Sequence, residues 1–320
     1  MLPPREHGGG LDEAVAAHGG SRADWLDLST GINPHSYPLP EIPAEAWTAL
    51  PDRAATKRLE QAARRFWSVP DAAGVLAAPG ASVLIAHLPR LLAPGRVRIP
   101  ARTYNEHEAA FRQHGWKILR ADPDGAPAEA RVVVHPNNPT GQMFSGAGEP
   151  PTRPLLVIDE SFCDLILHNS RVCGFATRSG TVILKSFGKF WGLAGLRLGF
   201  AIGDPALIGR LKQMLGPWPV SGVAQHLGAV ALEDMDWAND IRQQLLVETA
   251  RLDAVFEARG AELVGGTALF RLFRVDDARA WQARLARGRV WTRAFASEPT
   301  WLRVGLPPGK GWAQLERALG

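Results

Sequence analysis

Short apolar runs alternate with helix-like stretches through the middle of the chain. Several of these runs are apolar without interruption, which is typical of strands covered on both faces in a mostly parallel sheet. Amphipathic stretches between them predict helices near residues 56–67, 81–93, 105–114 and 204–215. The predicted strands are residues 74–78, 96–99, 116–119, 131–135, 155–159, 181–185 and 198–202. This alternation predicts an α/β fold.

The two ends of the chain follow other patterns. Residues 1–40 are rich in glycine and proline, and they predict an extended arm with one short helix near 11–18. After residue 218, a helical pattern over 221–259 precedes an alternating stretch at 266–275, a helix near 277–287 and a strand-like stretch at 301–307. We therefore expect an arm over 1–45 that joins a smaller α+β domain at 218–320. The large domain would cover 46–217, with its boundary at the Gly-Pro-Trp-Pro stretch 216–219.

Composition and charge exclude several classes of protein. With 46% hydrophobic residues, the 320-residue chain is too apolar to be disordered. Its net charge is only +4 and its basic residues are scattered, so we expect no nucleic-acid partner. No segment approaches the roughly 18 uninterrupted apolar residues of a membrane span. Cys163 and Cys173 have no metal-binding spacing, and the N-terminus lacks the apolar core of a signal peptide, so we expect a cytoplasmic protein without a metal site.

Polar side chains follow five of the predicted strands, at the edge where open α/β sheets bind ligands. Each alone has an ordinary explanation, such as a helix N-cap, a packed ring, a structural acid or a surface lysine. Together they offer a phosphate cradle, a stacking ring, an amide, a carboxylate and an amine. This set fits a flat, phosphorylated, cationic heterocycle that forms a Schiff base. The residues are Gly80, Ala81, Ser82, Tyr104, Asn138, Asp159, Ser186 and Lys189.

Three motifs resemble the signature of fold-type-I pyridoxal-phosphate enzymes, in their class I/II aminotransferase branch. They are Asn137-Asn138-Pro139-Thr140-Gly141, Asp159-Glu160, and Ser186-Phe187-Gly188-Lys189 followed by Gly-Leu-Ala-Gly-Leu-Arg-Leu-Gly at 192–199. Their order and spacing match over nearly the whole chain. The resemblance implies a large domain that binds pyridoxal 5'-phosphate on a mostly parallel sheet, a smaller α+β domain, an N-terminal arm and a homodimer.

The resemblance also implies a role for each matching residue. Lys189 joins the cofactor as a Schiff base, and Asp159 keeps the ring nitrogen protonated. The other expected cofactor contacts are Asn138 on the ring hydroxyl, Tyr104 stacked on the ring, and Ser186, Arg197 and the backbone N–H groups of Gly80, Ala81 and Ser82 on the phosphate. Two positions depart from the family pattern. Phe162 and Leu50 stand where many relatives have tyrosines, the second of which reaches the partner subunit's cofactor, so that contact is not carried over.

The N-terminal arm narrows the resemblance to a subfamily. His7-Gly8-Gly9 and the later Leu-Ser-Thr-Gly-Ile-Asn-Pro at 28–34 are similar to the threonine-phosphate decarboxylases of cobalamin biosynthesis. In this interpretation Arg303 binds the substrate carboxylate, and His7 with Arg293 binds the substrate phosphate. The arm around Ile32 and Asn33 closes over the substrate.

The implied activity is decarboxylation of L-threonine O-3-phosphate to (R)-1-amino-2-propanol O-2-phosphate, with a small phosphorylated amino acid as the partner. Two other functions fit the same motifs. One is a histidinol-phosphate-type or other class I/II aminotransferase, because the sequence does not show which bond at the substrate's α-carbon is held for cleavage. The other is a cofactor-binding regulator without enzymatic activity.

Overall fold

The computed structural model describes residues 7–120, 127–150 and 153–320, which form two compact units. The larger unit comprises the described residues within 36–138 and 142–239. The smaller unit comprises 7–35, 139–141 and 240–320. Helix α9 (Met235–Glu257) begins in the larger unit and ends in the smaller one.

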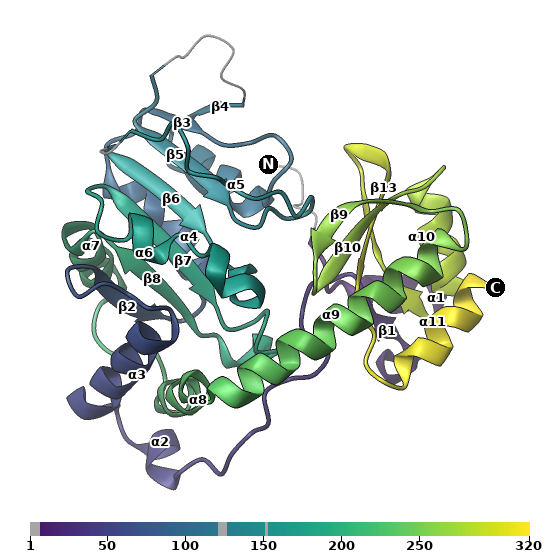
Figure 1. The fold of residues 1–320 in the computed structure, drawn as a ribbon, viewed down its shortest axis with the longest axis horizontal. Coiled ribbons are helices and arrows are strands. Elements are labelled where there is room, and N and C mark those ends of the chain that lie inside the picture. The colour runs from purple at the N-terminus through teal and green to yellow at the C-terminus, as the bar shows by residue number, and fades with distance from the viewer. Residues whose placement is uncertain (1–6, 121–126, 151–152) are drawn as a thin grey trace. The chain divides into compact units, whose positions relative to one another are not determined.

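A seven-stranded sheet forms the centre of the larger unit, in the order β2-β8-β7-β6-β5-β3-β4 (Figure 1). Strands β7, β6, β5, β3 and β4 run parallel, and β8 is antiparallel to both β2 and β7. The strands are β2 (Gly74–Ala78), β3 (Arg96–Arg98), β4 (Lys117–Leu119), β5 (Ala130–Val134), β6 (Leu155–Asp159), β7 (Thr181–Ser186) and β8 (Gly199–Gly203). All seven strand predictions are confirmed to within one residue at each end. The mostly parallel α/β fold is confirmed with them.

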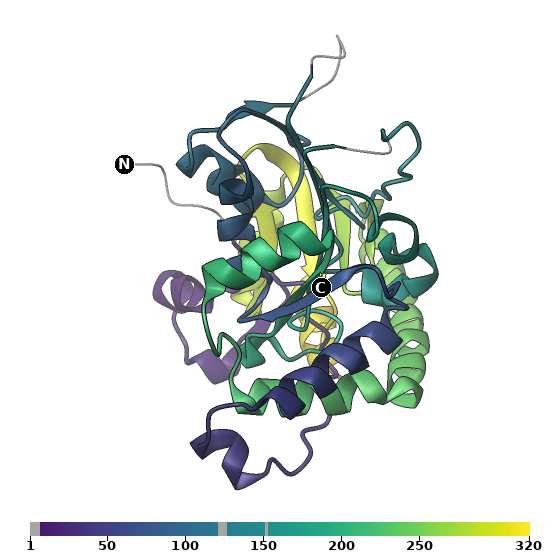
Figure 2. The ribbon, with the colours of Figure 1, turned by 90° about the vertical axis from the view of Figure 1, so that its left-hand side faces the viewer.

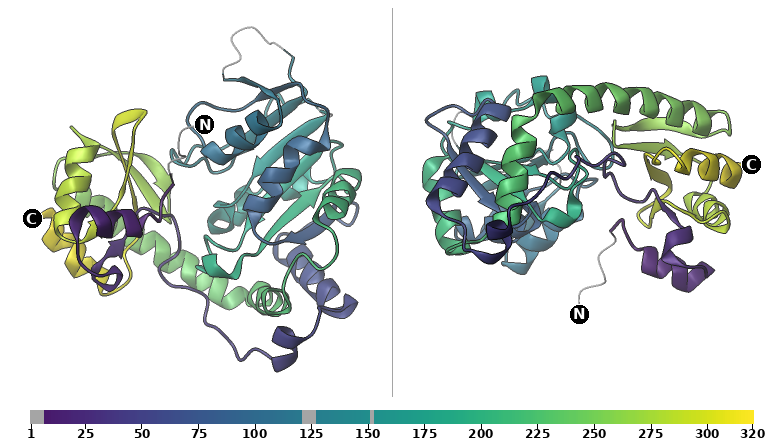
Figure 3. Two further views of the ribbon diagram at one scale, coloured as in Figure 1. Left: turned by 180° about the vertical axis from the view of Figure 1, so that it is seen from behind. Right: turned by 90° about the horizontal axis from the view of Figure 1, so that it is seen from below.

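Helices cover both faces of this sheet. On one face, alternate strand residues such as Leu76, Val132, Val157 and Leu184 pack with α4 (Ala81–His87), α5 (Asn105–Gln113), α7 (Pro205–Leu215) and the 3-10 segment Leu88–Leu91 (Figure 3). We call it the α4 face. On the other face lie α3 (Arg53–Phe66) and α6 (Val172–Phe175), and the ring of Trp67 packs on Phe200 with centroids 4.9 Å apart. We call it the Trp67 face. Because side chains alternate along a strand, each strand residue belongs to one face or the other.

Helix α8 (Gly222–Glu233) lies alongside α3 and so belongs to the larger unit (Figures 1 and 2). A Cβ on Gly228 would lie 3.1 Å from Cδ1 of Leu59 on α3 and would overlap the side chain of Leu198, so glycine allows α8 to pack closely here. The predicted boundary at 216–219 is therefore corrected: residues 218–239 pack with the larger unit, as do residues 36–45, which include α2 (Ala44–Thr48). A helical period shows that a helix has an apolar face, but it does not show which segment covers that face.

The smaller unit contains a four-stranded antiparallel sheet in the order β12-β13-β10-β9. A short parallel pair, β1 with β11, joins the arm to it. The α+β character predicted for the C-terminal part is present, and the arm helix has the predicted bounds. The elements are α1 (Leu11–His18), β1 (Leu26–Asp27), β9 (Glu262–Thr267), β10 (Phe270–Arg274), α10 (Ala278–Arg287), β11 (Val290–Trp291), β12 (Arg293–Phe295), β13 (Glu298–Gly305) and α11 (Gly311–Leu319).

The remaining short elements are 3-10 segments at Arg22–Asp24, Cys163–Asn169 and Ala194–Leu196. Within the described ranges, none of the helices combines the length and the apolar character that crossing a membrane requires.

Candidate functional site

A pocket lies in the larger unit at the carboxyl ends of β5, β6 and β7. The carboxyl ends of parallel strands meet at one edge of a sheet, which explains why residues far apart in the sequence gather here. All nine residues predicted to bind the cofactor line this pocket: Gly80, Ala81, Ser82, Tyr104, Asn138, Asp159, Ser186, Lys189 and Arg197. Ser161, Phe162 and Gly188 line it as well.

Asp159 is a buried carboxylate at the end of β6, with 2% of its surface exposed. Its Oδ2 lies 2.8 Å from Nε2 of His107. Its Oδ1 accepts hydrogen bonds from the backbone N–H and the hydroxyl of Ser161, at 3.0 and 2.6 Å. Burial alone would raise the pKa of Asp159, but His107 and Ser161 outweigh it and hold the pKa below its ordinary value. The pocket therefore contains a negative charge at neutral pH.

His107 and Ser161 are the contacts of Asp159 that the sequence reasoning missed. His107 lies on α5 three residues after Tyr104, so the two rings share one side of the helix, with centroids 6.1 Å apart at 83°. Ser161 follows Asp159 by two residues, the spacing of an Asx turn. These spacings are the signals that could have found them, but both are common in proteins.

The start of α4 and the Arg197 side chain form a tight cradle at one end of the pocket. Gly80 has φ +90°, and a Cβ there would lie 2.7 Å from Nη2 of Arg197. A Cβ on Gly199 would lie 2.5 Å from the backbone nitrogen of Ala81. Arg197 itself has φ +53° and donates a hydrogen bond from Nη1 to the carbonyl of Ala194, at 3.1 Å. Glycine at position 80 thus lets the Arg197 guanidinium lie against the backbone at the start of α4, and this brings a cation beside backbone N–H groups, which are donors of the kind that bind anions.

Two lysines near the pocket differ in the surroundings of their amines. Lys189 is half-buried and lines the pocket, with its Nζ 5.5 Å from the ring centroid of Phe162. Lys185 is fully buried, and its Nζ lies 2.6 Å from Oε2 of Glu160. Burial would lower the pKa of Lys185, but Glu160 and Asp164 outweigh it and raise the pKa. Of the two, Lys189 presents an amine to a ligand in the pocket.

Two arginines stand directly opposite each other on neighbouring strands of the smaller unit. Arg303 on β13 pairs in register with Arg293 on β12. Arg303 is 3% exposed, and its Nη2 donates a hydrogen bond to the carbonyl of Ser29 at 2.6 Å. Like charges directly opposite each other destabilise a sheet, so this pairing indicates a place that binds anions.

The glycines of the arm lie beside Arg303. A Cβ on Gly8 would overlap the carbonyl oxygen of Ser29 and would lie 3.4 Å from Nη2 of Arg303. The backbone N–H of Gly9 donates to the hydroxyl of Ser29 at 2.7 Å. His7, the residue before this contact, is exposed.

The two remaining predicted substrate residues also belong to the smaller unit. Ile32 is half-buried. Asn33 is 3% exposed, and its side-chain oxygen accepts a hydrogen bond from the backbone of His35 at 2.9 Å. In the structure Asn33 thus makes a local hydrogen bond, and its role in substrate binding stays a prediction. The five predicted substrate residues lie in the smaller unit and the nine cofactor residues in the larger one.

Comparison with known proteins adds a family and several relatives. The model of the family "Aminotransferase class I and II" matches residues 24–320. A threonine-phosphate decarboxylase from a Sinorhizobium species is 40% identical over 96% of this chain and 95% of its own. A threonine-phosphate decarboxylase from Pseudomonas aeruginosa is 38% identical over 98% of this chain and 97% of its own. Among solved structures, histidinol-phosphate aminotransferase from Sinorhizobium meliloti in complex with pyridoxal-5'-phosphate has a TM-score of 0.82 at 18% identity, covering 100% of this chain and 94% of that one.

The contact between His107 and Asp159 gives a pH-dependent prediction. The pKa of Asp159 is lowered in the folded protein, so its charge stabilises the fold. This stabilisation is fully present at pH values above the ordinary aspartate pKa of about 3.9, and it is lost as the pH falls through the pKa of the folded state. We expect His107→Leu to lower the free energy of unfolding by about 1–3 kcal/mol at pH 7. The loss of unfolding free energy should be smaller at pH 4, because Asp159 of the variant then binds a proton and no longer leaves a buried charge without its partner.

Urea unfolding at the two pH values measures this difference. The exposed His168 supplies the matched control, since His168→Leu should change stability by less than about 0.5 kcal/mol. An equal loss for His107→Leu at both pH values would contradict the assignment of its effect to the charge on Asp159.

Proposed function

Since the chain belongs to the aminotransferase class I and II family, we propose that it is a pyridoxal-phosphate-dependent lyase, a threonine-phosphate decarboxylase. It converts L-threonine O-3-phosphate to (R)-1-amino-2-propanol O-2-phosphate in cobalamin biosynthesis. The observation that carries this choice is the 40% identity to a threonine-phosphate decarboxylase over 96% of the chain. The packing of the His-Gly-Gly arm beside Arg303 supports it.

The pocket of the larger unit fits pyridoxal phosphate. Its cradle places the Arg197 guanidinium beside the backbone of Gly80, and this combination of a cation with backbone N–H donors suits a phosphate group. Asp159 supplies a buried negative charge for a protonated ring nitrogen, and Lys189 supplies an amine. When bound, the cofactor supplies a cationic conjugated ring that accepts the electron pair left by a bond broken at the substrate's α-carbon.

The residues of the pocket then have separate tasks. Lys189 would hold the cofactor through Nζ, and the same amine would carry the proton that replaces carbon dioxide at the substrate's α-carbon. Asp159 holds a proton on the ring nitrogen, and His107 and Ser161 keep its carboxylate oriented.

The remaining pocket residues fix the position of the cofactor. Asn138 donates to the ring hydroxyl and Tyr104 covers the ring face. The phosphate is bound by Ser186, Arg197 and the backbone of Gly80, Ala81 and Ser82.

The residues of the smaller unit bind the substrate. Arg303 binds the carboxylate, and His7 with Arg293 binds the phosphate. A decarboxylase must hold the bond between the α-carbon and the carboxylate perpendicular to the cofactor ring, and contacts at both ends of a short substrate achieve this. Ile32 and Asn33 lie in the arm that excludes water from these charges.

An aminotransferase of the histidinol-phosphate type is the second candidate. The observation that favours it is the TM-score of 0.82 with a histidinol-phosphate aminotransferase over the whole chain. The same lysine and aspartate serve both reactions, and the difference is which bond of the α-carbon stands perpendicular to the ring.

The protein acts in the cytoplasm as a homodimer. Near the start of the larger unit, three large apolar side chains are mostly exposed: Leu39 at 68%, Trp47 at 68% and Leu50 at 67%. They belong to one stretch of chain, and Leu50 also lines a groove with Ala46, Pro51 and His226. Exposed apolar surface of this kind is typical of an interface between subunits.

Release of carbon dioxide from phosphothreonine tests the proposed reaction. We expect the purified protein with added cofactor to release carbon dioxide without any keto acid. Lys189→Ala should lose this activity and the visible absorbance of lysine-bound cofactor while it stays folded, and Lys117→Ala, at an exposed lysine, should keep both. Amino transfer to 2-oxoglutarate without release of carbon dioxide would favour the aminotransferase instead.

Substitution of Gly8 tests the role of the arm. Gly8→Val places a side chain against the carbonyl of Ser29 and displaces the arm from Arg303. We expect the KM for phosphothreonine to rise about tenfold or more, equivalent to the loss of one charge-assisted contact. The absorbance of bound cofactor should not change. Gly209→Ala, at a glycine of α7 with open space around it, is the control. An unchanged KM in Gly8→Val would remove the arm from substrate binding.

Sedimentation at micromolar concentration tests the homodimer. We expect a species of twice the 34.6 kDa chain mass. Trp47→Asp with Leu50→Asp should shift it toward monomer, because charges replace the exposed apolar side chains. A monomer for the unsubstituted protein would exclude the proposed assembly.

A further inference from the structure

A buried cluster of one lysine and two carboxylates lies on the Trp67 face of the sheet, opposite the face that carries the pocket. Lys185, on β7, has its Nζ 2.6 Å from Oε2 of Glu160 and 3.4 Å from Oδ1 of Asp164. None of the three side chains is more than 2% exposed. The Lys185 amine also lies 5.5 Å from the ring centroid of Trp67. The proposed reaction uses none of these groups.

Two residues of this cluster are direct neighbours, in the sequence, of residues that line the pocket. Glu160 follows Asp159, and Lys185 precedes Ser186. Because side chains alternate along strands, Asp159 and Ser186 point to the α4 face, where the pocket lies, and Glu160 and Lys185 point to the Trp67 face. The backbone N–H of Glu160 donates to the carbonyl of Leu184 at 2.9 Å, so the two strand ends are still paired here. The ion pair therefore links the ends of β6 and β7 that carry Asp159 and Ser186.

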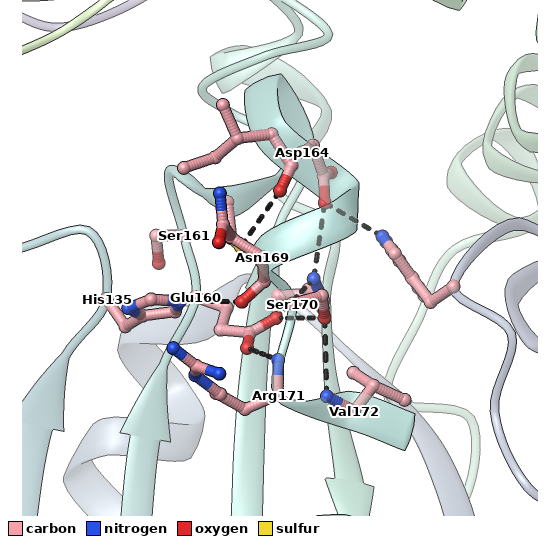
Figure 4. A network of polar contacts seen from close by, with 12 residues as sticks. His135, Glu160, Ser161, Asp164, Asn169, Ser170, Arg171 and Val172 are labelled. Atoms are coloured by element: carbon pink, nitrogen blue, oxygen red, sulfur yellow. Dashed lines mark hydrogen bonds and ion pairs between the residues drawn. The ribbon is translucent and has the colours of Figure 1, made fainter. Parts of the chain in front are cut away.

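Glu160 also fixes the segment that follows it (Figure 4). Its Oε1 accepts a hydrogen bond from the backbone N–H of Arg171 at 2.5 Å, and its Oε2 accepts one from the hydroxyl of Ser170 at 2.7 Å. Asp164 accepts a hydrogen bond from the indole N–H of Trp67 at 2.8 Å. These contacts hold residues 160–171 at both ends and in the middle. Ser161 and Phe162, which line the pocket, belong to that segment.

A metal site is the competing interpretation of this cluster. His135, Glu160 and Cys163 place ligand atoms within 4.8 Å of one another. However, both nitrogens of His135 already have partners: Nδ1 accepts from the backbone N–H of Phe144, and Nε2 lies 2.9 Å from the carbonyl of Asn169 (Figure 4). Burial raises the pKa of the Cys163 thiol, whereas a metal ligand must be a thiolate. The Lys185 amine therefore supplies the positive charge that Glu160 requires.

We infer that Lys185 and Glu160 are positioning residues. They do not touch the cofactor themselves, but they hold the ends of β6 and β7 in the place from which Asp159 and Ser161 meet the cofactor ring. This inference rests on the proposed function, since it assigns the pocket to pyridoxal phosphate. Removing the amine leaves two buried carboxylates without their cation. The strand ends and residues 160–171 then shift, and Asp159 moves away from the ring nitrogen.

Lys185→Met and Lys185→Arg test the inference, with cofactor absorbance measured against pH alongside activity. In Lys185→Met we expect turnover to fall about a hundredfold, the effect of a displacement of about 1 Å in an active site. The pH midpoint of the bound cofactor's visible absorbance should rise, because a ring nitrogen that Asp159 no longer keeps protonated withdraws less charge from the nitrogen of Lys189. Lys185→Arg should recover most of both, since it restores the cation.

Two further variants separate positioning from stability. Arg271→Met breaks an ion pair with Asp253 at 2.7 and 2.8 Å in the smaller unit, and it should lower the melting temperature without moving the pH midpoint. If Lys185→Met does not fold, Lys185→Met with Glu160→Gln and Asp164→Asn removes the cation together with both of its carboxylate partners and should fold, with the midpoint still raised. A folded variant of either kind with the wild-type midpoint and turnover would overturn the inference. Cofactor binding without decarboxylation by the wild-type protein would instead overturn the proposed reaction alone.

Discussion

A carboxylate that is almost completely withdrawn from water must be compensated by its neighbours, and Asp159 is such a group. Its three hydrogen bonds come from two places in the chain, His107 on α5 and Ser161 just beyond β6. Both elements must therefore be in place for the carboxylate to stay ionised once it is buried. The pocket, its proposed cofactor and its proposed chemistry all depend on that charge, because a protonated ring nitrogen needs an ionised partner.

Alternation along the strands divides the polar groups of the larger unit into two sets. Asp159 and Ser186 point to the α4 face, and Glu160 and Lys185 point to the Trp67 face. One residue along a strand therefore separates a group that lines the pocket from a group of the buried ion pair. The same alternation places Lys185 on the face away from the pocket, whereas Lys189, which follows the end of β7, lines the pocket. The amine of Lys185 is buried among carboxylates on the opposite face.

In the smaller unit, the two arginines that we propose as substrate-binding residues face each other across neighbouring strands. Arg293 and Arg303 pair across two strands, which a sheet without an anionic ligand would not favour. The arm lies against this place through Gly8 and Gly9, where a larger side chain would meet the backbone of Ser29. A phosphorylated amino acid, the proposed substrate, carries charges opposite to those of the two arginines.

Residue patterns along the chain predicted the strands, the mostly parallel sheet and eight of the residues that line the pocket, and the family resemblance added Arg197. These follow from local information, since apolar runs mark strands and the residues after parallel strands meet at one edge. Tertiary structure alone decided that His107 supports Asp159, that α8 packs on α3 in the larger unit, and that Lys185 pairs with Glu160. Each of these depends on contact between segments far apart in the chain, and a residue pattern carries no record of which distant segment will cover it.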